Sequence, residues 1–287
     1  MLVLLSIFFV FASGPVEERK VEPTWLYRDV SSLREQHVDL STGSCHYIPI
    51  FGEGDSQARL PKSLSRFGEL RVDPHGACTV VEYPRDEELY FILEGTGVLR
   101  YGEDSHPLSQ NDFTYLPPAV RHSVENPSDR PLRILVSTVR IPQGLSPSAA
   151  GKLVVANLRE LEARTVEGHP DSVLYKLLIG PRSGVRDRIN ATYAVADFFL
   201  MDFAPGGTNF PHHHETEEEV YLLLDGEGQI AAGSGTDGVE GLRPAKPGDA
   251  YYFRPNCTVG FYNQNKPGAK AHILAVRTFV PASKKSD

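Results

Sequence analysis

The chain of 287 residues is poor in cysteine, has no long basic stretch and carries a single long apolar run. Its three cysteines show no CxxC spacing, so they indicate neither a disulfide framework nor a zinc knuckle. One disulfide with one free thiol stays open if the chain is exported; small buried residues are the other interpretation. The formal net charge is −8, and no Lys/Arg run stands out except the short tail Lys284-Lys285. Such a surface repels a phosphate backbone, so nucleic acid is not an expected partner.

The apolar run lies at the N-terminus, from Leu2 to Ala12. It is too short to cross a bilayer as a helix, but its length and the small residues after it are typical of a signal peptide. We therefore predict a signal peptide at residues 1–14 and a secreted or periplasmic chain. No Lys or Arg precedes the run, so a cytoplasmic chain with a mis-assigned start is the alternative. No other stretch is long enough to span a membrane, and none is expected in the mature chain.

The sequence contains an internal repeat. The segment EELYFILEGTG at 87–97 returns as EEVYLLLDGEG at 218–228, and further matches follow in the same order. Self-similarity of this kind indicates two copies of one fold. The copies are expected at residues 25–142 and 153–283, joined by the Pro/Ser/Gly-rich linker 143–152.

Each copy has the pattern of β structure. Short segments rich in β-branched and aromatic residues alternate with Gly, Pro, Asn and Asp turns, which predicts antiparallel strands in a sandwich or barrel. Helical periodicity is weak, and residues 157–164 are the best short candidate. The segments with the clearest strand pattern in the first copy are Leu89 to Leu93, Val98 to Tyr101, Phe113 to Leu116 and Ile134 to Val139.

Two histidines and a glutamate in the second copy form a candidate metal site. Histidines two apart on a strand share a face, so His212 and His214 converge, and a turn can bring Glu219 to the same ion. Two imidazoles and one carboxylate form a facial set that leaves coordination positions open. A solvent-facing His/Glu-rich loop is the alternative.

With the flanking Gly206 and Gly226, this spacing matches the first signature motif of the cupin family, and the chain resembles a bicupin over about residues 25–282. The resemblance implies an all-β fold of two tandem β jelly-roll (cupin) barrels with few short helices, and metal ligands inside the barrel. It also implies a homodimer that exchanges N-terminal strands. In the second signature Val259 stands where a histidine is usual, so a fourth ligand is missing. Cys257 could replace it, although a buried inert thiol is the alternative.

The first copy departs from the pattern at the histidine pair. Glu82 and Pro84 are expected where the two histidines belong, while Glu88 and His122 are kept. A second site from Glu82, Glu88 and His122 could bind Mn or Mg. We favour a structural barrel without a metal, because losing one of few ligands removes most of the affinity.

These features favour a metal-dependent enzyme acting on a small organic acid or an aromatic substrate, and among such enzymes an oxygenase using Fe(II). Mn(II), Ni(II) or Zn(II) suit the same ligands. One alternative is an isomerase, decarboxylase or aminohydrolase that uses the metal as a Lewis acid; another is a non-catalytic cupin that binds metal and a small ligand. Asp202 and Arg254 are candidates for an acid or base and for a carboxylate-binding group. Solvated surface charges are the other interpretation of both.

Overall fold

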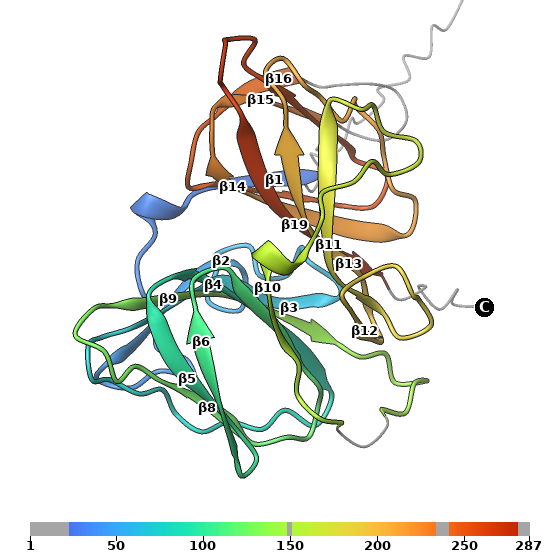
Figure 1. The fold of residues 1–287 in the computed structure, drawn as a ribbon. Helices are drawn as coiled ribbons and strands as arrows, with labels where there is room; N and C mark the ends of the chain where they lie inside the picture. The colour runs from blue at the N-terminus through green and yellow to red at the C-terminus, as the bar shows by residue number, and fades with distance from the viewer. Residues whose placement is uncertain (1–22, 148–150, 234–240, 281–287) are drawn as a thin grey trace, which may run out of the picture.

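The computed structural model describes residues 23–147, 151–233 and 241–280. Residues 1–14, with the predicted signal peptide, lie outside this part, as does the middle of the predicted linker. Two β-barrels are stacked on each other, the N-terminal one blue to green and the C-terminal one yellow to red (Figure 1). The helical elements of the described residues are two 3₁₀ turns, η1 (Val30–Ser32) and η2 (Leu158–Glu160). The predicted all-β fold with few short helices is confirmed. No helix in this part is long and apolar enough to cross a membrane.

The first barrel consists of a six-stranded and a three-stranded sheet. The larger sheet contains, in spatial order, β10 (Val155–Asn157), β7 (Asp112–Leu116), β4 (Asp86–Glu94), β9 (Leu132–Arg140), β3 (Leu64–Val72) and β2 (Cys45–Gly52). The smaller contains β6 (Asp104–Ser109), β5 (Thr96–Tyr101) and β8 (His122–Glu125). The four segments with the clearest strand pattern in the sequence lie within β4, β5, β7 and β9, so these strand predictions are confirmed.

The second barrel repeats this plan with a seven-stranded and a three-stranded sheet. The larger sheet contains β1 (Trp25–Asp29), β17 (Asp249–Phe253), β14 (Glu217–Asp225), β19 (Ala271–Phe279), β13 (Val195–Phe203), β11 (Val173–Pro181) and β12 (Ile189–Thr192). The smaller contains β16 (Gly241–Ala245), β15 (Gly228–Gly233) and β18 (Thr258–Asn263). Gly226 enables the tight turn between β14 and β15, since its φ is +82° and a Cβ there would lie 2.3 Å from the carbonyl oxygen of Lys270.

The two barrels exchange strands. β1, from the start of the first copy, pairs antiparallel with β17 of the second barrel, and Figure 1 shows this blue strand among the orange and red ones. β10, from the start of the second copy, pairs with β7 of the first barrel. The repeat boundary near residues 143–152 therefore divides the sequence, whereas each large sheet takes its outer strand from across it. The exchange occurs within one chain; the homodimer stays a prediction.

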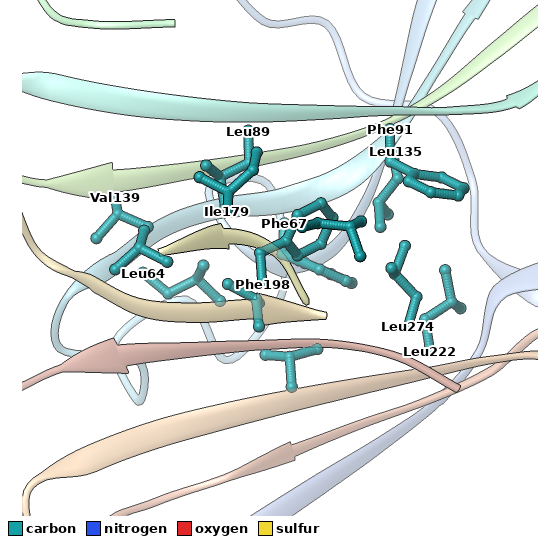
Figure 2. Packing of buried hydrophobic residues seen from close by; sticks show 14 of the residues in the cluster. Leu64, Phe67, Leu89, Phe91, Leu135, Val139, Ile179, Phe198, Leu222 and Leu274 are labelled. Atoms are coloured by element: carbon teal, nitrogen blue, oxygen red, sulfur yellow. The ribbon is translucent and has the colours of Figure 1, made fainter. Parts of the chain in front are cut away.

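Buried apolar side chains form three clusters. One fills the first barrel, one fills the second, and one lies between the barrels with residues of both (Figure 2). Alternation along β14 illustrates the division: Tyr221 and Leu223 face the second barrel's interior, while Val220 and Leu222 pack in the cluster between the barrels. Burying each such side chain contributes about 1.5–3 kcal/mol, so the stacked arrangement is held mainly by apolar packing.

Two buried glutamates at equivalent repeat positions join the barrels. The carboxylate of Glu218 on β14 accepts hydrogen bonds from the backbone N–H groups of residues 62–64, at 2.7–2.9 Å, and from the hydroxyl of Tyr252 at 2.8 Å. Glu87 on β4 accepts in the same way from the N–H groups of residues 193–195, at 2.7–3.0 Å, and from Tyr115 at 3.1 Å. Each barrel therefore supplies a carboxylate that binds backbone of the other.

The cysteines are divided between one disulfide and one thiol. Cys45 on β2 is bonded to Cys78, in the segment after β3, and both are buried in the first barrel's core. Cys257 is a buried free thiol. This corresponds to the alternative of one disulfide and one free thiol that the sequence left open.

Candidate metal centre

The structure brings His212, His214 and Glu219 together inside the second barrel. One donor atom from each, two imidazole nitrogens and one carboxylate oxygen, can be chosen so that all lie within 4.8 Å of one another. Within residues 23–147, 151–233 and 241–280, no other group of three His, Cys, Asp or Glu side chains meets this spacing. The site thus has the composition expected for a divalent transition metal.

Backbone contacts fix the first of these ligands. His212 forms an antiparallel bridge with Val259 on β18, with N–H···O distances of 2.9 and 2.8 Å. Its Nδ1 lies 2.8 Å from the carbonyl oxygen of Phe210, so the Nδ1–H donates there and Nε2 is left as the donor atom for a metal. The preceding loop is anchored by buried Asn209, which accepts from the N–H of Phe261 and donates to the hydroxyl of Tyr221.

The carboxylate of Glu219 is buried and charged, as a metal ligand inside a barrel has to be. The residue is 3% exposed, and its Oε2 accepts no hydrogen bond, although Nε2 of His214 lies 3.4 Å away. An ionised oxygen buried without a hydrogen bond is costly, and coordination to a cation removes that cost. Burial alone would raise the pKa of Glu219, but His214, Arg277 and His212 hold it below its ordinary value. Burial lowers the pKa of His212. At neutral pH these two ligands therefore have the protonation states that metal binding needs.

An arginine lies against the ligand set. Arg277 on β19 is in register with Glu219 on β14, and its Nη1 is 3.1 Å from Nδ1 of His214. Its Nη2 donates to Asp197, which also pairs with Arg186. The sequence analysis did not single out Arg277. The repeat contained a signal, since the equivalent position in β9 is the small neutral Thr138, opposite Glu88.

The cavity beside the ligands is small. Its volume is about 40 Å³, roughly the space of one or two water molecules. Besides the ligands and the charged cluster Arg186–Asp197–Arg277, it is lined by Val166, His169, Tyr175, Leu177, Phe199, Met201, Asn209 and Tyr221. The charged cluster also lines an outer pocket of about 330 Å³, so it separates the inner cavity from that pocket.

His169 is a further histidine that the sequence analysis missed. Its ring lies edge-on to that of His212, with centroids 5.2 Å apart, and its Nδ1 is buried without a partner. It stands in a turn before β11, outside the motif spacing, so no pattern in the sequence pointed to it.

Comparison with known proteins identifies the family. The family model described as "Cupin domain" matches residues 68–138 and 199–276, one region in each barrel. The chain belongs to the cupin family.

Related proteins agree with this assignment. The cupin is 35% identical over 65 residues to an uncharacterised protein, MJ1618, of Methanocaldococcus jannaschii; the match covers 22% of this chain and 52% of that protein. The chain thus spans about half the length of this curated relative.

Solved structures share the fold over almost the whole chain. A putative glyoxylate-induced protein of Pseudomonas aeruginosa matches with a TM-score of 0.72 at 13% identity, covering 93% of this chain and 94% of that one. E. coli YlbA matches at 0.65 and 17%, covering 91% and 94%. An oxalate decarboxylase of Lactobacillus farciminis matches at 0.63 and 10%, covering 92% and 87%. At such identities the likeness shows the fold, a bicupin, and nothing finer.

The other candidates proposed for this site lie elsewhere. Met201 lines the cavity, and its neighbour Asp202 points to the opposite face of the same strand. Asp202 therefore faces outward, where it pairs with Lys270 at 3.1 Å. Arg254, at the end of β17, is not among the cavity-lining residues. The thiol of Cys257 donates to the carbonyl of Gly233, and Cys257 is not part of the ligand group. Buried Val259 occupies the position next to His212, so the structure shows no replacement for a fourth ligand there.

The predicted second site in the first barrel is not assembled. Glu88 and His122 form a buried ion pair, with Nε2 and Oε2 2.7 Å apart, whereas Glu82 is exposed. The prediction that Glu82 and Pro84 stand at the positions of the two histidines is wrong by one residue. Val81 bridges His122 as His212 bridges Val259, so Val81 rather than Glu82 is equivalent to His212. A shift of one residue on a strand reverses the face of the side chain, which places Glu82 in solvent.

Proposed function

We propose that this cupin is a metal-dependent enzyme acting on a small organic acid, and that it is an oxygenase with the His212, His214 and Glu219 site as its centre. The observation that carries the proposal is the convergence of two imidazole nitrogens on a buried carboxylate of Glu219 whose Oε2 accepts no hydrogen bond. Fe(II) suits a two-histidine, one-carboxylate set with open positions, and Mn(II), Ni(II) and Zn(II) are the alternatives. Iron there would supply Lewis acidity and one-electron redox chemistry.

The chain's own residues determine what substrate can bind. Arg277 presents a guanidinium beside His214, and Asp197 orients it, so its positive charge can attract a substrate carboxylate to the site. The cavity of about 40 Å³ favours a small aliphatic acid. An aromatic acid would need the Arg186–Asp197–Arg277 cluster to move. The surrounding Leu177, Phe199 and Met201 keep bulk water from the site.

Elemental analysis tests the metal centre. Purified protein is expected to hold about one metal ion per chain, and His212→Ala with His214→Ala should lose it. His46→Ala with His272→Ala removes two histidines outside the cavity and should keep it. Equal metal content in the wild type and the His212/His214 variant would contradict the proposal.

Oxygen uptake tests the reaction class. The iron-loaded protein is incubated with small aliphatic acids, diketones, catechols and gentisate, and uptake is expected with an aliphatic acid or diketone and to be abolished in Glu219→Gln. The same donor set also serves Lewis-acid chemistry, which the small cavity and Arg277 fit equally well. Release of carbon dioxide or ammonia under anaerobic conditions, with no uptake in air, would favour a decarboxylase or aminohydrolase.

We also propose that the chain is exported. The apolar run at residues 2–12 and the Cys45–Cys78 disulfide support this, because disulfides persist in oxidising compartments and are rare in the cytosol. Mass spectrometry of the protein from its source is expected to show cleavage near Gly14 and no free thiol at Cys45. An intact N-terminus on a cytosolic protein would contradict export.

A further inference from the structure

A second cavity lies between the barrels, away from the metal centre. Its volume is about 500 Å³, within the range of small-molecule sites, and it shares no lining residue with the cavity beside the ligands. The first barrel and the segment before β10 contribute Tyr101, Tyr115, Pro117 and residues 151–154; the second barrel contributes Arg182, residues 188–191 and Tyr193.

The charges on its wall are all positive. Lys152, Arg182 and Arg188 line the cavity, and none of its lining residues is a carboxylate. This is unexpected in a chain with 37 acidic and 29 basic residues. Arg188 also pairs with the half-exposed Glu160 at 3.0 Å, which neutralises part of its charge. A concave wall that carries one sign of charge attracts a ligand of the opposite sign, so the cavity favours an anion.

The wall also presents flat aromatic surface. Arg182 lies over the ring of Tyr193, with its guanidinium carbon 4.7 Å from the ring centroid, and donates to the tyrosine hydroxyl. This stacking holds the guanidinium in one orientation before a ligand arrives. Tyr101 and Tyr115 are buried side chains on the facing barrel.

Both walls are held in place by one carboxylate. Glu87 accepts from the hydroxyl of Tyr115 at 3.1 Å and from the backbone N–H of Tyr193 at 2.8 Å. The barrels' relative position at this cavity is therefore fixed by the same buried group that joins them. A site built in this way needs little ordering when it binds a ligand.

We propose that this cavity binds a small organic anion with a planar ring, its acidic group held by Arg182 and Arg188 and its ring against the tyrosines. The acidic group is a carboxylate or a phosphate, both of which accept the paired hydrogen bonds that a guanidinium offers. This ligand is separate from the substrate of the metal centre.

Calorimetric titration of the whole protein tests the proposal with four probes. Benzoate and phenyl phosphate carry a ring and an acidic group, benzamide lacks the charge, and inorganic phosphate lacks the ring. At least one of the first two is expected to bind, and benzamide and inorganic phosphate should bind at least about tenfold more weakly. The stronger of the two anions identifies the acidic group.

Matched variants locate the binding. Arg182→Gln with Arg188→Gln should weaken binding of the anion at least about tenfold, because both guanidinium groups lose their charge-assisted hydrogen bonds to it. Both arginines are exposed, so the variant should keep the thermal unfolding midpoint of the wild type. Arg243→Gln, outside this cavity, and His212→Ala with His214→Ala should bind as the wild type does. Absence of binding by both anions, equal binding of benzamide or inorganic phosphate, or loss in either control would overturn the proposal.

Discussion

Glu218 and Glu219 are neighbours on β14, yet their carboxylates serve opposite sides of the sheet. Glu218 points to the other barrel and accepts the N–H groups of residues 62–64, while Glu219 points into its own barrel beside His212 and His214. The strand's alternation thus assigns one acidic side chain to assembly of the two barrels and the next to the metal centre.

Glu219→Gln tests the role of Glu219 in the metal centre. The amide keeps the shape but loses the charge, so metal affinity is expected to fall by more than about 100-fold, beyond the 10–100-fold typical of groups that only support a ligand. The metal-free protein should also lose stability at neutral pH, because His214, Arg277 and His212 hold the pKa of Glu219 below its ordinary value despite its burial and the amide loses their attraction. Metal titration and urea unfolding measure the two effects. Glu217→Gln, on the same strand, is the control; a metal affinity in Glu219→Gln equal to that control would be inconsistent with ligation.

Glu218→Gln should lower the stability of the protein and leave its metal affinity unchanged. Its amide nitrogen would face N–H donors that now bond to a carboxylate, so we expect a loss of about 2–4 kcal/mol in the free energy of unfolding. Metal content should be retained in the folded protein. Urea unfolding of the metal-free protein is the measurement, again with Glu217→Gln as control. A loss below about 0.5 kcal/mol would show that the carboxylate does not join the barrels.

Glu69 should contribute to acid sensitivity. Burial alone would raise its pKa, but the guanidinium groups of Arg133 and Arg71 hold the pKa of Glu69 below its ordinary value of 4.5. A carboxyl with a lowered folded-state pKa adds stability that is present above the unfolded pKa and lost as pH falls through the folded one. Glu69→Gln should therefore be less stable than the wild type at pH 7, and the difference should shrink as the pH falls below the unfolded-state pKa.

Unfolding curves recorded from pH 7 down to pH 3 measure this difference. Exposed Glu103→Gln is expected to follow the wild type throughout. A constant difference between Glu69→Gln and the wild type at all pH values would contradict the ion-pair explanation.

The Cys45–Cys78 disulfide should stabilise the first barrel. It closes a loop between residues 33 apart in sequence, for which about 2–4 kcal/mol is typical. Addition of dithiothreitol is expected to lower the unfolding temperature of the wild type but not that of Cys45→Ala with Cys78→Ala. Cys257→Ala should keep the sensitivity of the wild type, since Cys257 is a free thiol. If dithiothreitol lowers the unfolding temperature of the double variant as much as that of the wild type, the disulfide is not the cause of the wild type's sensitivity.

The sequence predicted those features that depend on local spacing. The repeat predicted two equivalent all-β units, and the motif from Gly206 to Gly226 predicted which side chains meet, because strand parity and one turn are enough to bring them together. Arg277 and His169 could not be found in this way. They reach the site from β19 and from a distant turn, and only the pairing of β14 with β19 shows that Arg277 lies opposite Glu219.

Other features depended on the register between elements far apart in sequence. The roles of Glu87 and Glu218 were not predicted, since nothing near them in sequence reveals that backbone from the other copy supplies their donors. The second site failed for a related reason. Aligning the copies on Gly76 and Gly206 misplaced Glu82 by one residue, and only the bridge from Val81 to His122 gives the correct register.

The exchange of β1 and β10 has a consequence for synthesis on the ribosome. β1 is the first described strand to emerge, yet its partner β17 follows only near the end of the chain. Meanwhile β7 keeps an open edge until β10 has been made. The first barrel therefore cannot close before the second begins, and β1 must stay unpaired during most of translation.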